Sequence, residues 1–319
     1  MKKLVGLLIL ATALSVSCEH QDIQSLSQRK AVNFTTTVGT KTSYSGQVVN
    51  QKEAINWTDG DTFTITCAQA TPSSATYKVT APAGIATAVT PNTPVDEITW
   101  GDGTHTFYAA YPAGNLTGNV LNANISNSQT VTRVSDGVYA PSLSSNGYMV
   151  AAATANPEAA SVQLVFKPVF STLEFTVGPG DNADVVISEF SLVASSNAIA
   201  GSYQVTLSAD SDPAISTSSS STLISISFAG GNVTVNRGQT LTFSVIALPT
   251  ALTGLKARFK VNGEAKEFEL KTADGPISFA AGKKSRINAP AILGPEAVAA
   301  GITAVIDDQG VDDYTITVE

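Results

Sequence analysis

The clearest chemistry that this sequence suggests belongs to a cysteine near its start. Cys18 follows a basic pair, Lys2 and Lys3, an apolar run over residues 4–14 and the small residues 15–17. This order is typical of a secretory signal, because the apolar run is too short to span a bilayer. A cysteine directly after the small residues looks like a bacterial lipobox, in which the signal is cut before the cysteine and its thiol takes a lipid.

We therefore expect a signal peptide over residues 1–17, lipidation of Cys18 and a polar tether over residues 18–30. Ser15 stands where the usual lipobox has leucine. The alternative is an ordinary secretory signal, cut after Ser17, that leaves a free cysteine. A free thiol of this kind is unusual in an exported protein, so lipidation is the preferred interpretation.

Histidine could support acid–base catalysis, but the chain has only two. His20 falls in the tether, and His105 falls beside a turn at Gly103, where we expect a surface histidine. A Ser-His-Asp site on His105 would need a nucleophile elbow or a similar turn, and the sequence has none. Cysteine and histidine show no zinc-ligand spacing. We expect no catalytic site, no cofactor and no bound metal.

Two clusters of charged residues have more than one interpretation. Asp307, Asp308, Asp312 and Asp313 could bind calcium or form a solvated hairpin turn, and they lack the spacing of known calcium loops. A basic cluster at 283–286 could be a binding site or a charged edge strand that blocks edge-to-edge pairing. The net charge of −8 argues against nucleic acid as a partner.

Composition and periodicity indicate an all-β protein. Hydrophobic residues make up 43% and charged residues 14%, which allows substantial cores under a surface of Ser, Thr, Asn and Gly. Apolar residues alternate with polar ones in many stretches, and no stretch keeps a 3.6-residue period over three turns. The alternating stretches lie at 32–38, 63–67, 164–166, 173–177, 186–192, 223–228, 233–235, 241–245, 302–306 and 314–318.

Strands separated by turn signals predict β-sandwiches, and the length of the chain predicts two of them. The boundary falls near Asn156-Pro157-Glu158, which gives an N-terminal sandwich over residues 31–157 and a C-terminal sandwich over residues 158–292. Residues 293–319 have strand character without a full domain around them. Cys67 falls in an alternating stretch, so we expect it to be buried.

Six short motifs follow one another between residues 32 and 290. They are WTDGDTFTI at 57–65, FYAAYP at 107–112, LVFKPVFSTLEF at 164–175, AGSY at 200–203, ALP at 247–249 and FAAGKKSRI at 279–287. Together they resemble the fimbrillin family, the subunits of type V fimbriae of Gram-negative anaerobes. The resemblance implies two tandem transthyretin-like, Greek-key β-sandwich domains with a C-terminal strand appendage, and a structural or adhesive subunit rather than an enzyme.

The resemblance also implies a route of assembly. Such subunits are exported as lipoproteins, and a trypsin-like protease removes the first strand so that the open groove accepts a strand of the next subunit. Here residues 31–38 are the first strand and Lys41 in the following turn is the processing site. Known members are cut after arginine, so either a lysine-tolerant protease acts or this subunit keeps its first strand and stays anchored. Cleavage at the alternatives, Arg29 or Lys30, would release the lipid without opening the groove.

The C-terminal tail is the candidate donor strand. Its residues with the required alternation are Ile302, Ala304, Ile306, Tyr314, Ile316 and Val318. The alternative is that the tail pairs with its own domain as a final hairpin.

The expected partners are other fimbrial subunits in a homo- or hetero-polymer, the outer membrane through the lipid, and a receptor on a host or bacterial surface. The expected location is a lipid-anchored outer-membrane precursor that joins the fimbrium at the cell surface. The alternative function is an outer-membrane surface lipoprotein that binds glycan for polysaccharide capture. Trp57 and Trp100, the only tryptophans, are too few for a sugar-stacking platform and each precedes a turn as a core residue would.

Overall fold

The computed structural model describes residues 29–38, 43–49, 52–80, 86–218, 221–272, 277–294, 304–306 and 313–318. Within these ranges the chain is almost entirely β, interrupted by a single-turn helix α1 (Leu143–Asn146) and a 3-10 turn η2 (Pro94–Asp96). The all-β prediction is therefore confirmed. No helix in this part of the chain is long and apolar enough to cross a membrane.

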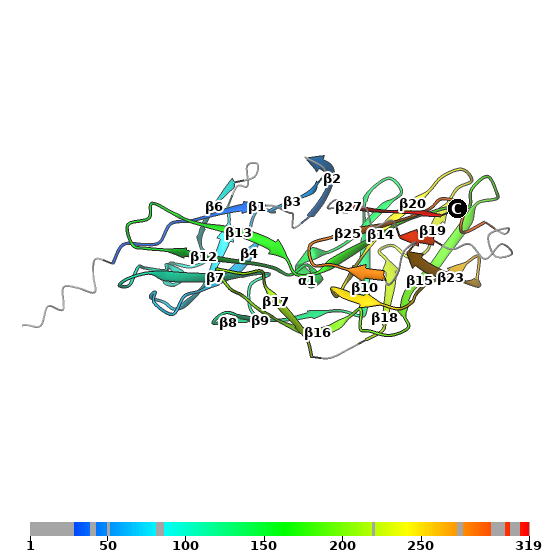
Figure 1. The fold of residues 1–319 in the computed structure, drawn as a ribbon. Helices are drawn as coiled ribbons and strands as arrows, with labels where there is room; N and C mark the ends of the chain where they lie inside the picture. Colours follow the sequence, from blue (N-terminus) through cyan, green and yellow to red (C-terminus); the bar gives the residue numbers. More distant parts are fainter. Residues whose placement is uncertain are drawn as a thin grey trace, which may run out of the picture.

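The N-terminal end of the molecule is a ring of strands that closes on itself (Figure 1). In order around the ring the strands are β1 (Phe34–Val38), β13 (Val162–Pro168), β12 (Met149–Ala155), β7 (His105–Tyr111), β4 (Thr62–Thr66), β5 (Ser74–Val79) and β6 (Ala86–Pro91). Alternate side chains of a strand face opposite sides. Phe63, Tyr77 and Phe107 are fully or almost fully buried, and they form the centre of the ring.

The C-terminal end is a large sheet of twelve strands among the described residues. Its order is β18 (Leu223–Phe228), β10 (Ser128–Ser135), β11 (Val138–Pro141), β20 (Leu241–Ala247), β14 (Ser171–Val177), β25 (Lys284–Ala289), β27 (Asp313–Val318), β26 (Ala304–Ile306), β23 (Glu264–Thr272), β22 (Leu255–Val261), β15 (Val185–Ala194) and β19 (Val233–Val235). β15 also pairs with β18, so the sheet folds back on itself and encloses a second core.

Smaller sheets complete the fold. A four-stranded sheet, which lies along one side of the junction in Figure 1, has the order β17 (Ala214–Thr217), β16 (Gly201–Thr206), β9 (Val120–Ile125) and β8 (Leu116–Thr117). Two further pairs are β2 (Ser43–Val49) with β3 (Lys52–Asn56), and β21 (Thr250–Leu252) with β24 (Ile277–Phe279).

The second core is centred on phenylalanines from four strands, β14, β15, β20 and β22. Phe175 and Phe243 stack with ring centroids 5.2 Å apart, and Phe190 meets both edge-on at 4.9 and 4.8 Å. Phe259 lies 4.8 Å from Phe190. Aromatic pairs in these geometries add about 0.5–1.5 kcal/mol to the gain from burial, so this cluster is a main source of stability in the C-terminal half.

Strand positions agree with the alternating stretches of the sequence. Each stretch named above coincides with a strand or part of one, including β26 and β27 in the tail. Cys67 is 1% exposed, as expected, and burial raises the pKa of its thiol.

Hydrogen bonding does not follow the predicted boundary between residues 157 and 158. β13, which follows the boundary, pairs with β1 in the N-terminal ring. β10 and β11, which precede it, pair in parallel with β18 and β20 of the large sheet. Short alternating stretches cannot specify which partner a strand takes, because pairing between distant segments depends on the whole fold. The division into units 31–157 and 158–292 thus stays a prediction, and strands of each half complete a sheet of the other.

One buried glutamine links a strand of the first half of the chain to a strand of the second half. Gln129 on β10 is 2% exposed. Its Nε2 donates to the carbonyls of Ile246 at 2.7 Å and Ser126 at 3.1 Å, and its Oε1 accepts from the N–H of Ile246 at 3.1 Å. The side-chain amide therefore pairs with β20 as a backbone peptide group would. Asn146 supports the same crossover by accepting from the N–H of Ser126 at 2.8 Å.

Replacing Gln129 with methionine should lower the free energy of unfolding by about 2–4 kcal/mol, because two buried backbone groups of Ile246 lose their partner. Chemical denaturation measures this change. Gln204→Met is the matched control, since Gln204 bonds Asn122 on an exposed face and should cost less than about 0.5 kcal/mol. Equal effects of the two substitutions would contradict the assigned role of Gln129.

Candidate assembly site

The first strand of the ring is hydrogen-bonded along both edges. β1 runs parallel to β13, with Phe34 beside Val162, and antiparallel to β6, with Thr35 beside Ala88. The chain just before it is also held: the N–H of Val32 donates to the carbonyl of Ile98 at 2.8 Å. β1 is therefore an internal strand, and its removal would leave unpaired backbone groups on two neighbours.

The inward face of β1 fills the centre of the ring. Val32 and Phe34 are each 4% exposed and Thr36 is fully buried. The Phe34 ring meets Tyr77 at 5.1 Å and Phe107 at 5.2 Å, both edge-to-face. Burial of a large apolar side chain is worth about 1.5–3 kcal/mol, so the slot under β1 is a strongly apolar groove.

Further aromatic residues pack around Trp57 in the same ring. Trp57 is 4% exposed and lies 5.9 Å from Phe63, 5.4 Å from Tyr111 and 5.2 Å from Phe166. Asp61 closes the turn between Trp57 and Phe63, since it accepts from the N–H of Thr58 at 2.7 Å and from the Tyr111 hydroxyl at 3.3 Å. Burial and this carboxylate raise the pKa of Tyr111. The WTDGDTFTI motif is thus a structural element of the ring.

The predicted processing residues flank β1. Arg29 and Lys30 are exposed and precede it; Arg29 Nη1 donates to Thr71 Oγ1 at 3.4 Å, and the Lys30 carbonyl accepts from the N–H of Trp100 at 3.0 Å. A cut after either residue would leave β1 in the ring. Lys41 lies outside the described residues, between the end of β1 at residue 38 and the start of β2 at residue 43. The lipidation candidate Cys18 also lies outside them.

The candidate donor residues lie in the large sheet of the same chain. β27, which holds Tyr314, Ile316 and Val318, runs parallel to β25 and antiparallel to β26. β26, which holds Ala304 and Ile306, runs parallel to β23, and Ile302 lies outside the described residues. The tail thus occupies the slot between β25 and β23 of its own sheet. A donor role requires the tail to leave this slot.

An ion cluster lies where β25 joins this sheet. Glu174 on β14 accepts from Lys284 Nζ at 2.6 Å and from Arg286 Nε at 3.1 Å, and the Lys284 side chain is only 8% exposed. Burial alone would raise the pKa of Glu174, but the two cations hold it below its usual range. Of the two interpretations of the basic cluster at 283–286, the charged edge strand is wrong, because β25 lies between β14 and β27. The opposite charge on β14 makes it possible to bury a lysine there.

His105 is buried rather than on the surface, so that expectation is wrong as well. Its side chain is 0% exposed and packs edge-on against Trp100 at 5.1 Å. Nε2 accepts from the N–H of Gly101 at 2.8 Å and Nδ1 donates to the carbonyl of Gly103 at 2.9 Å. Both ring nitrogens are occupied by the turn, so His105 stabilises the turn before β7 and has no nitrogen free for catalysis.

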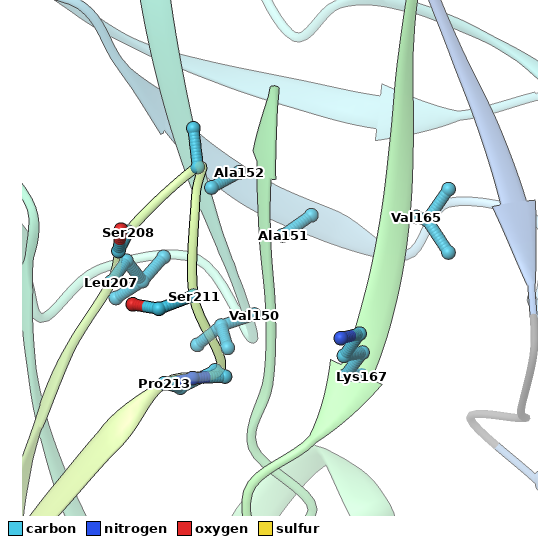
Figure 2. A pocket seen from close by; sticks show the side chains of 10 residues that line it. Val150, Ala151, Ala152, Val165, Lys167, Leu207, Ser208, Ser211 and Pro213 are labelled. Carbon is cyan, nitrogen blue, oxygen red and sulfur yellow. The ribbon is translucent and has the colours of Figure 1, made fainter. Parts of the chain in front are cut away.

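A shallow hollow of about 130 Å³ lies on the outer side of the ring. Figure 2 shows Val165 and Lys167 of β13 on one side, Leu207, Ser208, Ser211 and Pro213 of the loop after β16 on the other, and Val150, Ala151 and Ala152 of β12 between them. Lys167 Nζ bonds Asp212 Oδ1 at 2.8 Å, but both side chains are mostly exposed. In the part of the chain that the structure describes, no group of three His, Cys, Asp or Glu residues could hold a metal ion.

Known structures share this architecture. A proposed cell adhesion protein from Bacteroides ovatus superposes with a TM-score of 0.56 at 14% identity, over 92% of this chain and 96% of that one. A second, from Bacteroides uniformis, gives 0.51 at 18% identity, over 91% and 97%. At such low identity the likeness concerns the fold alone. The chain thus shares its β fold with these two structures.

The family itself follows from the sequence match. The family described as fimbrillin-like matches residues 30–308, which is most of the chain. The protein belongs to the fimbrillin-like family and is a member of a family of fimbrial subunits. No curated protein matches the sequence closely enough to add a more specific assignment.

Phe34→Ala should lower the free energy of unfolding by about 3–5 kcal/mol, because it empties a site between two aromatic rings. Tryptophan fluorescence during chemical denaturation measures this, since Trp57 and Trp100 are both buried in the ring. Val95→Ala is the control: Val95 is 83% exposed, and its truncation should change stability by less than about 0.5 kcal/mol. A Phe34→Ala cost below about 1 kcal/mol would contradict the packing described here.

Glu174→Gln should destabilise the protein by about 3 kcal/mol at pH 7, because it removes the carboxylate that pairs with both the buried Lys284 and Arg286. The pKa of Glu174 is lower in the folded state, so its contribution is full above the ordinary value of 4.5 and is lost as the pH falls through the folded value. The difference between variant and wild type should therefore shrink as the pH is lowered below about 4.5. Glu267→Gln, in an exposed ion pair, should cost less than about 1 kcal/mol. A difference that does not depend on pH would exclude this account.

Proposed function

We propose that this protein is a structural or adhesive fimbrial subunit that is exported as a lipoprotein, loses its first strand by proteolysis and polymerises by strand exchange. The observation that carries the proposal is the position of β1, which is internal to a closed ring and lies ahead of the predicted cut. Loss of this one strand would open a groove with two unpaired edges and an apolar floor. A strand from another subunit would pair with the two edges and cover the apolar floor. This is the general basis of β-augmentation.

The order of the segments supports processing at Lys41. The lipidation candidate Cys18, the tether and β1 all precede this residue, and the rest of the ring follows it. One cut after Lys41 would therefore release the lipid and free β1 from the chain. A cut at Arg29 or Lys30 would release the lipid alone, and Lys30 is held to Trp100 at the ring wall.

Lipid anchoring belongs to the precursor stage of this proposal. The lipid on Cys18 would hold the subunit at the outer membrane until the cut, after which the subunit would join the fimbrium at the cell surface. Its partners would then be further subunits, identical or different, and a surface receptor for adhesion.

Glycan capture, the alternative function, has less support. Sugar-binding faces rely on exposed aromatic rings, and both Trp57 and Trp100 are 4% exposed. Among the described residues the large apolar side chains on the surface are valine and leucine. We therefore prefer the fimbrial function.

Lys41→Ala in the full precursor should block both maturation and assembly in a host with the processing protease. The wild type should give a mature chain beginning at Thr42 by mass spectrometry, and denaturant-resistant ladders on gels. The variant should keep a lipidated Cys18 and remain monomeric. An Arg29→Ala/Lys30→Ala double variant is the control and should behave as wild type. Ladders that persist in Lys41→Ala would exclude this processing site.

A further inference from the structure

The first strand of the ring and the last strand before the C-terminal tail both run parallel to a neighbour. β1 runs parallel to β13, with Phe34 beside Val162, and β25 runs parallel to β14, with Lys284 beside Thr172. On their other edges β13 and β14 pair antiparallel, with β12 and with β20. Both neighbours are therefore held inside their sheets.

These two neighbours form one continuous stretch of chain. Only Val169 and Phe170 separate the end of β13 from the start of β14, and both residues are buried. The N–H of Val169 donates to the carbonyl of Tyr148 at 3.0 Å, and the carbonyl of Phe170 accepts from the N–H of Gly282 at 2.8 Å. Figure 1 shows β13 and β14 following one another from the ring into the large sheet. We call this stretch, residues 162–177, the spine.

The strand directions place the two outer strands at opposite ends of the spine. Because β1 is parallel to β13, its N-terminal end lies beside Val162, at the end of β13 that is remote from β14. Because β25 is parallel to β14, its C-terminal end at Ala289 lies beside Val177, at the end of β14 that is remote from β13. A force that pulls the chain apart at these two points therefore acts along the spine.

Such a force loads the hydrogen bonds of both strand pairs in shear. Five residues of β1 are in register with β13, and six residues of β25 are in register with β14. The hydrogen bonds run from strand to strand, so a force along the strands loads all bonds of a pair together. A force that separates two adjacent strand ends instead breaks the bonds one after another. Rupture along the spine thus requires several bonds to fail at once.

Side chains oppose sliding in both strand pairs. Phe34 lies edge-to-face between two aromatic rings of the core, so β1 cannot move along β13 without withdrawing this ring. Glu174 on β14 bonds Arg286, its neighbour in register, and also Lys284, which lies two residues earlier on β25. Movement of β25 along β14 would break both ion pairs.

We propose that this protein is a load-bearing element, in which the strand pairs β1–β13 and β14–β25, joined by the spine, carry tension that is applied along the chain. The biological role of this tension rests on the proposed function, since a subunit attached to a surface or to other subunits is pulled along its length. The mechanical property itself depends only on strand pairing within one chain.

Single-molecule force spectroscopy on the full chain tests this proposal by comparing two directions of pulling. Exposed residues are replaced by cysteine as thiol handles in a Cys18→Ser background, where the remaining Cys67 is 1% exposed. The Lys30→Cys/Ala291→Cys handles pull along the spine. The Lys30→Cys/Ala160→Cys handles are the matched control, because they lie just before the adjacent ends of β1 and β13 and open the same strand pair one bond at a time.

At equal loading rates the chain should unfold at a force at least about twofold higher with the 30/291 handles than with the 30/160 handles, because forced unfolding follows the unfolding rate and shear has the higher barrier. Equal forces for the two handle pairs would overturn the load-bearing role. They would leave the fimbrial function standing, since the measurement involves no export, processing or polymerisation. Conversely, a failure of the Lys41→Ala test would overturn the fimbrial function without changing these forces.

A third pair of handles isolates the β14–β25 pair. Lys167→Cys/Ala291→Cys joins two exposed positions and pulls along this pair alone. With these handles Glu174→Gln should unfold at least about tenfold faster at a fixed force, because a sliding β25 no longer breaks ion pairs. With the 30/160 handles the same substitution should leave the rate unchanged, since that route does not load β25. Equal acceleration in both directions would reduce Glu174 to a general stabilising residue and remove the ion cluster from the load-bearing role.

Discussion

Pairing of β1 along both of its edges is the constraint on which the N-terminal ring depends. A closed sheet has no free edges, and each of its strands completes the hydrogen bonding of two others. β6 and β13 meet in the ring only through β1. The same strand supplies Phe34 to the aromatic centre, so backbone pairing and core packing depend on a single segment of five residues. Loss of β1 would therefore remove both the pairing of two neighbouring strands and part of the aromatic centre.

Strands from each half of the chain pair within the sheet of the other half, and this pairing connects the ring to the rest of the molecule. β13 completes the ring from the second half, while β10 and β11 extend the large sheet from the first half. Gln129 joins β10 to β20 through two hydrogen bonds to Ile246. Neither sheet is complete without residues of the other half. Such interleaving makes the two halves depend on each other for folding, because an incomplete sheet exposes both its edge and its core.

Buried and half-buried polar residues in this protein stabilise turns and strand junctions. His105 uses both ring nitrogens to hold the turn before β7, and Asp61 closes the turn of the WTDGDTFTI motif. Glu174 compensates the buried charge of Lys284. Each of these residues belongs to a class that also performs catalysis, but each has its polar atoms occupied by neighbours. Their role is to maintain the shape of the sheets.

Residue order and local periodicity determined the strands and the buried positions of Trp57, Trp100 and Cys67, because alternation and turn residues act over a few neighbours. The signal and lipidation of Cys18 stay predictions from the same kind of local pattern. Tertiary structure alone decided which strands pair. The parallel pairing of β1 with β13 joins segments more than a hundred residues apart, and no local pattern encodes such a contact. Burial of His105 and Lys284 likewise depended on groups supplied by a turn and by β14.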